Sequence, residues 1–278
     1  MAKILKESPL RKKRQKVWRT RFALCLFLLV GVIVGVSFWS KSPKMAINTV
    51  TVTDAKSVDE QMVERIANQT LDEKYLHLFS KRNFLIYPKT EIKKNILAEL
   101  KRISEVKINL DKKVLSINIA EREGEFLWCE GMATFDKCYF LDNQSYIFSV
   151  APYFSDGVYF KVYSPLASPY ADPIGQSVFK DGYFEKVLEF KKELEVLGLK
   201  IVALEYKEDV SKFLLESRGN ATNPEIIFNN NDDFAEAVSN LSVLLENEKV
   251  AEEFKDKYKK LLYIDLRYGN KIYYKFSE

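Results

Sequence analysis

Residues able to do chemistry are sparse in this 278-residue sequence. His77 is the only histidine, so a Ser-His-Asp triad or a tetrahedral zinc site would depend on that single residue. The S-x-x-K pattern of penicillin-binding enzymes occurs at Ser177–Lys180 and at Ser104–Lys107, but its S-D-N and K-T-G companions are absent. Two occurrences in a lysine-rich chain indicate chance. We therefore expect no catalytic residue, no metal ion, no cofactor and no small-molecule substrate.

The segment Phe22–Trp39 has 18 residues without a charge or a proline. At about 1.5 Å per residue, a helix over this segment covers most of the ~30 Å hydrocarbon core of a bilayer. Residues 1–21 carry a net charge of +8, and because the whole chain carries +4, the remainder carries −4. The positive-inside rule therefore predicts a basic cytoplasmic tail over 1–21, a transmembrane helix over 22–39 and an extracytoplasmic remainder.

A cleaved signal peptide is the alternative to an uncleaved anchor, but its apolar core spans only about 7–15 residues and ends near a small-residue cleavage site. Here the apolar run ends in Phe38 and Trp39, which suit the membrane interface. Gly31 and Gly35 form a G-x-x-x-G pattern, which allows two membrane helices to approach closely but is common in Gly/Val-rich segments. The expected anchor residues are Phe22, Gly31, Gly35 and Trp39.

Cys129 and Cys138 lie nine positions apart in the predicted extracytoplasmic part, whereas Cys25 lies inside the apolar segment. The compartment allows a disulfide, but spacing alone does not decide its geometry. A Cys129–Cys138 bridge and two reduced thiols both stay open as alternatives.

The remainder of the chain has the composition of a folded protein. Hydrophobic residues make up 47% and aromatic residues 13% of the sequence, which excludes a disordered tail. The charges beyond residue 39 are well mixed and slightly acidic, which argues against nucleic acid as a partner.

After a short linker over 40–46, residues 47–122 read as strand, helix, helix, strand, strand. The first strand and the last two alternate apolar with polar residues, whereas the helices place apolar residues three and four positions apart. The stretch 68–87 between the helices shows no regular pattern and is expected to be irregular.

From residue 123 the chain predicts a β-rich α+β domain with a mostly antiparallel sheet, extending to 278. A helix over 183–197 and another that begins at Asp232 or Asp233 interrupt the strands. The last two strands form a hairpin, in which Leu262, Ile264 and Leu266 alternate. The predicted strands are 126–129, 138–141, 146–148, 158–163, 199–206, 212–216, 225–228, 262–266 and 271–276.

This order of elements resembles the FtsQ/DivIB family of bacterial cell-division proteins. Residues 47–122 resemble the family's POTRA domain and residues 123–278 its β domain. The most specific piece is Tyr263–Lys275, YIDLRYGNKIYYK, which is similar to the family's C-terminal strand, Gly/Asn turn and final strand. Cys138–Asp142 followed by Ile147-Phe148 resembles a second family segment. The chain departs from the family in the long stretch 68–87 and in lacking a proline before the second POTRA strand.

The resemblance implies a non-enzymatic scaffold of the divisome, anchored in the cytoplasmic membrane and placed at the septum. Its partners would be FtsB/FtsL-like proteins, bound by strand addition to a sheet edge near the C-terminus. The implied partner-binding residues are Lys271, Ile272, Tyr273, Tyr274, Lys275 and Phe276. An alternative function is that of another membrane-anchored POTRA-type receptor or export scaffold, and an anchored cell-wall hydrolase is disfavoured by the missing motifs.

The final strand also has a purely structural interpretation. Ile272, Tyr274 and Phe276 share one face and would cover the core, while Lys271 and Lys275 on the other face would protect the edge against aggregation. Asp265 and Arg267 lie two positions apart on the preceding strand. We expect them to form a solvated pair or to bind a partner at the sheet edge, and not to act in catalysis.

Overall fold

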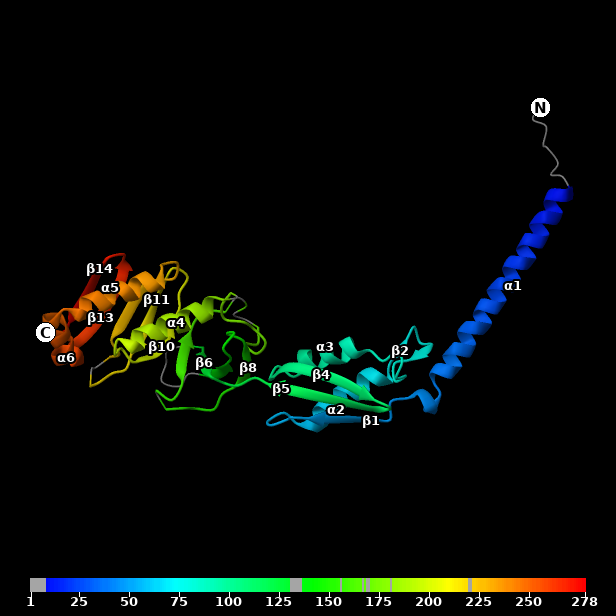
Figure 1. Cartoon of the computed structure of the whole chain (residues 1–278), viewed down its shortest axis with the longest axis horizontal. Coiled ribbons are helices and arrows are strands. Elements are labelled where there is room, and N and C mark those ends of the chain that lie inside the picture. Colours follow the sequence, from blue (N-terminus) through cyan, green and yellow to red (C-terminus); the bar gives the residue numbers. More distant parts are fainter. Residues whose placement is uncertain are drawn as a thin grey trace, which may run out of the picture. The chain divides into compact units, whose positions relative to one another are not determined.

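The computed structural model describes residues 9–130, 137–155, 157–166, 168, 171–180, 182–219 and 222–278. The first eight residues of the predicted basic tail lie outside that part of the chain. The protein consists of two compact units, Met1–Glu121 and Arg122–Glu278. Each unit has its own hydrophobic core, and each is described by itself (Figure 1).

The first unit begins with helix α1 (Pro9–Ser40), which contains the predicted apolar span (Figure 1). Lys16–Ser40 is long and apolar enough to cross a membrane, and only 6% of its most apolar window is buried. This exposure distinguishes α1 from the core helix of a soluble protein, whereas its place near the N-terminus suits both an anchor and a signal sequence. A short 3-10 turn, η1 (Pro43–Met45), follows.

The rest of the first unit has the predicted order of strand, helix, helix, strand, strand. The sheet order is β1-β5-β4, with β1 parallel to β5 and β5 antiparallel to β4. Apolar side chains of both helices, including Val63 and Ile92, are fully buried against the sheet. These elements are β1 (Thr49–Thr53), α2 (Glu60–Asp72), α3 (Lys89–Glu99), β4 (Ile103–Asp111) and β5 (Val114–Glu121).

The expectation of an irregular 68–87 stretch is wrong for its first half. Helix α2 continues to Asp72, and β2 (Lys74–Tyr75) then pairs antiparallel with β3 (Phe79–Ser80). The two central residues of this hairpin turn, Leu76 and His77, both have positive φ angles, 49° and 62°. Because such turns usually carry Asn or Gly, no turn signal is visible in the sequence at this point.

The second unit is built on a mixed, mostly antiparallel sheet of nine strands in the order β14-β13-β12-β11-β10-β9-β6-β7-β8. Three neighbouring pairs are parallel: β13 with β12, β10 with β9, and β9 with β6. The strands are β6 (Phe126–Cys129), β7 (Cys138–Leu141), β8 (Ile147–Val150), β9 (Phe160–Tyr163), β10 (Ile201–Glu205), β11 (Val210–Leu215), β12 (Glu225–Asn229), β13 (Leu261–Tyr268) and β14 (Lys271–Phe276).

The described part of this unit contains the helices α4 (Tyr183–Val196), α5 (Phe234–Glu246) and α6 (Glu248–Lys257), the last followed by the 3-10 turn η2 (Tyr258–Lys260). Figure 1 shows α4 and α5 lying across the strands. Their contact with the sheet is aromatic, since Phe190 of α4 stacks on Phe234 of α5 at 4.6 Å between ring centroids and meets Phe228 of β12 at 5.2 Å. Asp233 caps α5 as predicted, whereas α6 was not predicted.

Candidate partner-binding edge

Strand β14 lies at the end of the nine-stranded sheet, the position that the family resemblance implies. Its neighbour in the sheet is β13, which it pairs antiparallel from Tyr268↔Lys271 to Leu261↔Phe276. Among the strands that the structure describes, none pairs with the other side of β14. The strand therefore presents a free edge six residues long.

The backbone groups of β14 that point to this free side can be assigned from one hydrogen bond. The N–H of Ser277 donates to the carbonyl of Lys260 at 2.7 Å. Because residues of an antiparallel strand alternate between bonding the neighbour and pointing away from it, the odd-numbered residues bond β13. The N–H and C=O groups of Ile272, Tyr274 and Phe276 consequently point to the open side.

The side chains of these same three residues pack on the core, so the edge is rigidly held. Phe254 of α6 is the main contact, at 4.9 Å from the ring centroid of Tyr274 and 5.5 Å from that of Phe276. The hydroxyl of Tyr274 also lies 3.5 Å from a carboxylate oxygen of Glu253. The sequence reasoning missed α6, and with it the support of the edge strand, because its apolar residues are few.

The other face of β14 carries Lys271, Tyr273 and Lys275, all of which are exposed. Tyr273 is 51% exposed, and its ring meets that of Tyr268 edge to face at 5.1 Å. The expected division of side chains between two faces is therefore observed. A strand added beside β14 would find alternating backbone groups at the edge, with an aromatic and two cationic side chains on the accessible face.

Asp265 and Arg267 of β13 form a bidentate ion pair, in which Nε and one Nη of the arginine donate to the two carboxylate oxygens at 2.8 and 2.6 Å. Burial alone would raise the pKa of Asp265, but the hydrogen bonds and charge of Arg267 outweigh it and lower that pKa. The expectation of a solvated pair is wrong for the carboxylate, since Asp265 is only 6% exposed. A bulge in β13 between Asp265 and Tyr268 bends the strand at this pair.

At the far half of the sheet, the register of β6 and β7 places Cys129 directly opposite Cys138, with 4.2 Å between their Cα atoms. Of the two alternatives left open by the sequence, the structure has the disulfide. After β7 the chain turns at Asp142, which accepts hydrogen bonds from the N–H groups of Gln144 and Tyr146 and pairs with Arg122.

The predicted anchor residues all lie on α1, with Phe22 and Trp39 exposed. Around Gly31 and Gly35, an added Cβ atom would meet nothing within 4 Å, so the G-x-x-x-G face is open in the isolated chain. Whether it packs against another helix stays a prediction.

The two S-x-x-K segments lie in different units. In the second unit, Ser177 and Lys180 line a hollow of about 340 Å³ beside Arg122. In the first unit, the hydroxyl of Ser104 donates to the carbonyl of Ala120. In the described ranges, no group of three His, Cys, Asp or Glu side chains is placed to hold a metal ion.

No family model and no curated protein matches the sequence. The open edge of the sheet is therefore the observation from which a function is inferred.

Proposed function

We propose that this protein is a non-enzymatic scaffold of the bacterial divisome, of the FtsQ/DivIB type, anchored in the cytoplasmic membrane by α1. In this role the first unit is a POTRA domain and the second is an FtsQ-type β domain. An FtsB- or FtsL-like partner contributes a strand that pairs with β14, and the complex assembles at the septum.

The observation that carries the proposal is the free side of β14. Backbone groups of three residues point out of the sheet there, and an added strand satisfies them with main-chain hydrogen bonds. The core packing of Tyr274 and Phe276 holds the strand in place before binding, which lowers the ordering cost of association.

The orientation in the membrane follows from charge. The segment before the apolar span is strongly basic and the remainder of the chain is slightly acidic, so the tail lies in the cytoplasm and both folded units lie outside it. The Cys129–Cys138 disulfide supports this orientation, because disulfides persist in oxidising compartments.

The first test is a truncation with a matched control. A chain that ends at Asn270 lacks β14, whereas a chain that ends at Phe276 loses only Ser277 and Glu278. In detergent, with folding checked by circular dichroism, the first should lose binding to the extracytoplasmic segment of the FtsB-like partner and the second should keep it. Equal binding by the full chain and by a folded chain ending at Asn270 contradicts strand addition.

The second test separates a division scaffold from a general receptor or export scaffold. A fluorescent fusion of the full chain should gather at the septum of dividing cells. A uniform signal along the membrane, with the protein intact and folded, argues for the receptor function and against the division role.

A further inference from the structure

The β2–β3 hairpin of the first unit is fastened directly to the last turns of α1. The hydroxyl of Ser37 donates to the carbonyl of Leu78 at 2.7 Å, and the N–H of Ser80 donates to the hydroxyl of Ser40 at 3.0 Å. Asn83 adds a bond from its side-chain amide to the carbonyl of Ser40 at 3.3 Å. Ser37 and Ser40 are buried by these contacts, in an otherwise exposed helix. The hairpin therefore lies at the level where the apolar span ends.

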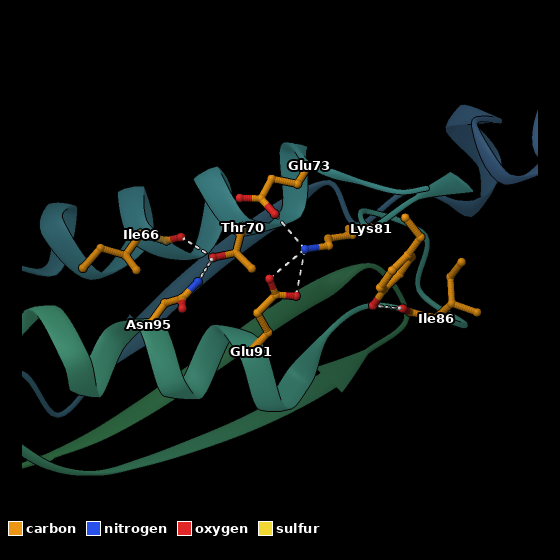
Figure 2. A network of polar contacts seen from close by, with 8 residues as sticks. Ile66, Thr70, Glu73, Lys81, Ile86, Glu91 and Asn95 are labelled. Atoms are coloured by element: carbon orange, nitrogen blue, oxygen red, sulfur yellow. Dashed lines mark hydrogen bonds and ion pairs between the residues drawn. The ribbon is translucent and has the colours of Figure 1, made fainter. Parts of the chain in front are cut away.

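Lys81, at the base of the hairpin, links the hairpin to the helices α2 and α3. Figure 2 shows its ammonium group between Glu73, at the end of α2, and Glu91 of α3, each 2.7 Å away. Burial alone would lower the pKa of Lys81, but the two carboxylates outweigh it and raise that pKa, so the lysine is charged at neutral pH. A rigid base holds the tip of the hairpin in one place.

Four apolar side chains are exposed here and are called the tip patch: Leu76 and Leu78 in the hairpin turn, and Leu85 and Ile86 in the segment that follows the hairpin. Leu76 is 82% exposed and Leu85 is 61% exposed. The hydroxyl of Tyr75 donates to the carbonyl of Ile86 at 3.1 Å and so holds the 85–86 segment beside the hairpin. An exposed apolar group of this kind marks a contact surface.

The hairpin turn has a leucine at a backbone position that leucine disfavours. Leu76 and His77 occupy the two positive-φ positions where Asn and Gly are favoured, and a bulky residue there is strained. Strain of this kind persists at functional positions. The turn is thus better explained by a contact that uses Leu76 than by the needs of the fold.

We propose that the tip patch inserts into the headgroup–acyl boundary of the bilayer, beside the point where α1 leaves it; this rests on the proposed function of α1 as a retained anchor. The bonds to Ser37 and Ser40 place the patch near Phe38 and Trp39, whose aromatic rings belong at the same boundary. Lys41 and Lys44, which follow α1 closely in the sequence, and Lys74 of β2 are exposed and suit anionic headgroups. Membrane contact at two points restrains the first unit at the bilayer surface.

The test is made on the full chain in vesicles of phosphatidylcholine and phosphatidylglycerol, with Cys25→Ser removing the free thiol. Single cysteines replace Leu76, Leu85, Met62 or Val30 and carry an environment-sensitive fluorophore. Met62 is the matched control, since it is also apolar and exposed but lies ten positions before the end of α2, about 15 Å along the helix. Val30 lies inside the apolar span and reports whether α1 is in the bilayer.

We expect labels at Leu76 and Leu85 to be blue-shifted and quenched by nitroxide lipids at least about twofold more strongly than at Met62, because interfacial insertion reaches only ~5–10 Å into the boundary. Aqueous labels at both tip positions, with a quenched label at Val30, overturn the inference and leave the anchor intact. Tip labels shielded from lipid and aqueous quenchers alike indicate a protein contact and also overturn it. An unquenched label at Val30 contradicts the anchor itself.

Discussion

At one end of the nine-stranded sheet, β8 is covered along part of its outer side by the segment 175–178, whereas at the other end β14 has no such cover among the described residues. Ile147 exchanges hydrogen bonds with Gly175 and Gln176 at 2.8 and 2.9 Å, and Val178 donates its N–H to the carbonyl of Ser145 at 2.9 Å. The strand β8 itself has only four residues, against six in β14. Both features are ways in which proteins block strand addition at an edge.

The difference between the two edges shows where a partner strand can be accepted. The β8 end is also restrained by the Cys129–Cys138 disulfide between β6 and β7. The β14 end is held by aromatic packing on α6 and leaves its backbone groups accessible. We therefore expect changes at the β8 end to alter stability and changes on the free side of β14 to alter binding.

The largest stability effect is expected from the disulfide. The double variant Cys129→Ser, Cys138→Ser removes the closure of a short loop, which should lower the free energy of unfolding by about 2–3 kcal/mol. Urea unfolding of the oxidised wild type, of the double variant and of the control Cys25→Ser measures this loss of stability. An unchanged unfolding midpoint in the double variant means that the bridge does not restrain this end. Partner affinity of the folded double variant should stay at the wild-type value.

A smaller effect is expected from the ion pair next to the open edge. Asp265→Asn leaves the guanidinium of Arg267 without its charged partner, at a cost of about 1–2 kcal/mol. Since Arg267 lowers the pKa of Asp265 in the folded protein, this stability is fully present above the ordinary carboxyl pKa of about 3.9 and is lost as the pH falls through the lower folded value.

Denaturant titrations of wild type and Asp265→Asn at several pH values measure this effect. The two unfolding free energies should differ by a constant amount between about pH 5 and 7, and this difference should shrink as the pH falls below the ordinary carboxyl pKa of about 3.9. Glu208→Gln, at an exposed carboxylate, is the control and should show no such pattern. A difference that persists unchanged into acid contradicts the assigned role of the Asp265 charge.

The cover of β8 can be loosened at Gly175, whose φ of 97° disfavours any side chain. Gly175→Ala should cost about 1 kcal/mol and open the 175–178 segment locally. Hydrogen exchange at the amide of Ile147 should become faster. Gly157→Ala is the matched control, because Gly157 also has a positive φ, 82°, but does not cover β8. Equal exchange at Ile147 in both variants contradicts the covering role.

The smallest effect on stability is expected from a substitution on the accessible face of β14. Tyr273→Ala should change the free energy of unfolding by less than about 0.5 kcal/mol, because the half-exposed ring packs mainly on Tyr268. Partner affinity should fall a few-fold, equivalent to about 1 kcal/mol of lost side-chain contact. Tyr153→Ala is the control, since Tyr153 is 81% exposed in the same unit but lies far from β14 in the strand order.

The sequence pattern predicted the last hairpin and its two faces, whereas the edge position of β14 was implied only by the family resemblance and the support from α6 was missed. Alternation of Ile272, Tyr274 and Phe276 was enough to place their side chains on the core, and the Gly269 turn was visible as a hairpin signal. Helix α6 was missed because its apolar residues are few, and Phe254 is its one buried side chain. Its stability comes from the contact of Phe254 with β14 together with local features, the Asn247 cap and the Glu253–Lys257 ion pair.

Register is the second feature that local pattern does not determine. Leu262 was expected inside with Ile264 and Leu266, but a shift in pairing between Leu261 and Tyr263 buries Leu261 and leaves Leu262 exposed. The pairing of Cys129 with Cys138 depends in the same way on the β6–β7 register, which their nine-residue spacing leaves undecided.

The most direct test of strand addition compares two substitutions of one residue on the free edge. Tyr274→Pro and Tyr274→Ala both lose the ring that packs on Phe254, but only proline removes the N–H that points to the open side. With both variants folded, the affinity for the FtsB-like partner should be at least about tenfold weaker for proline than for alanine, because the missing bond and the added ring exclude a paired strand. Equal affinities of the two variants would contradict recognition through the backbone of β14.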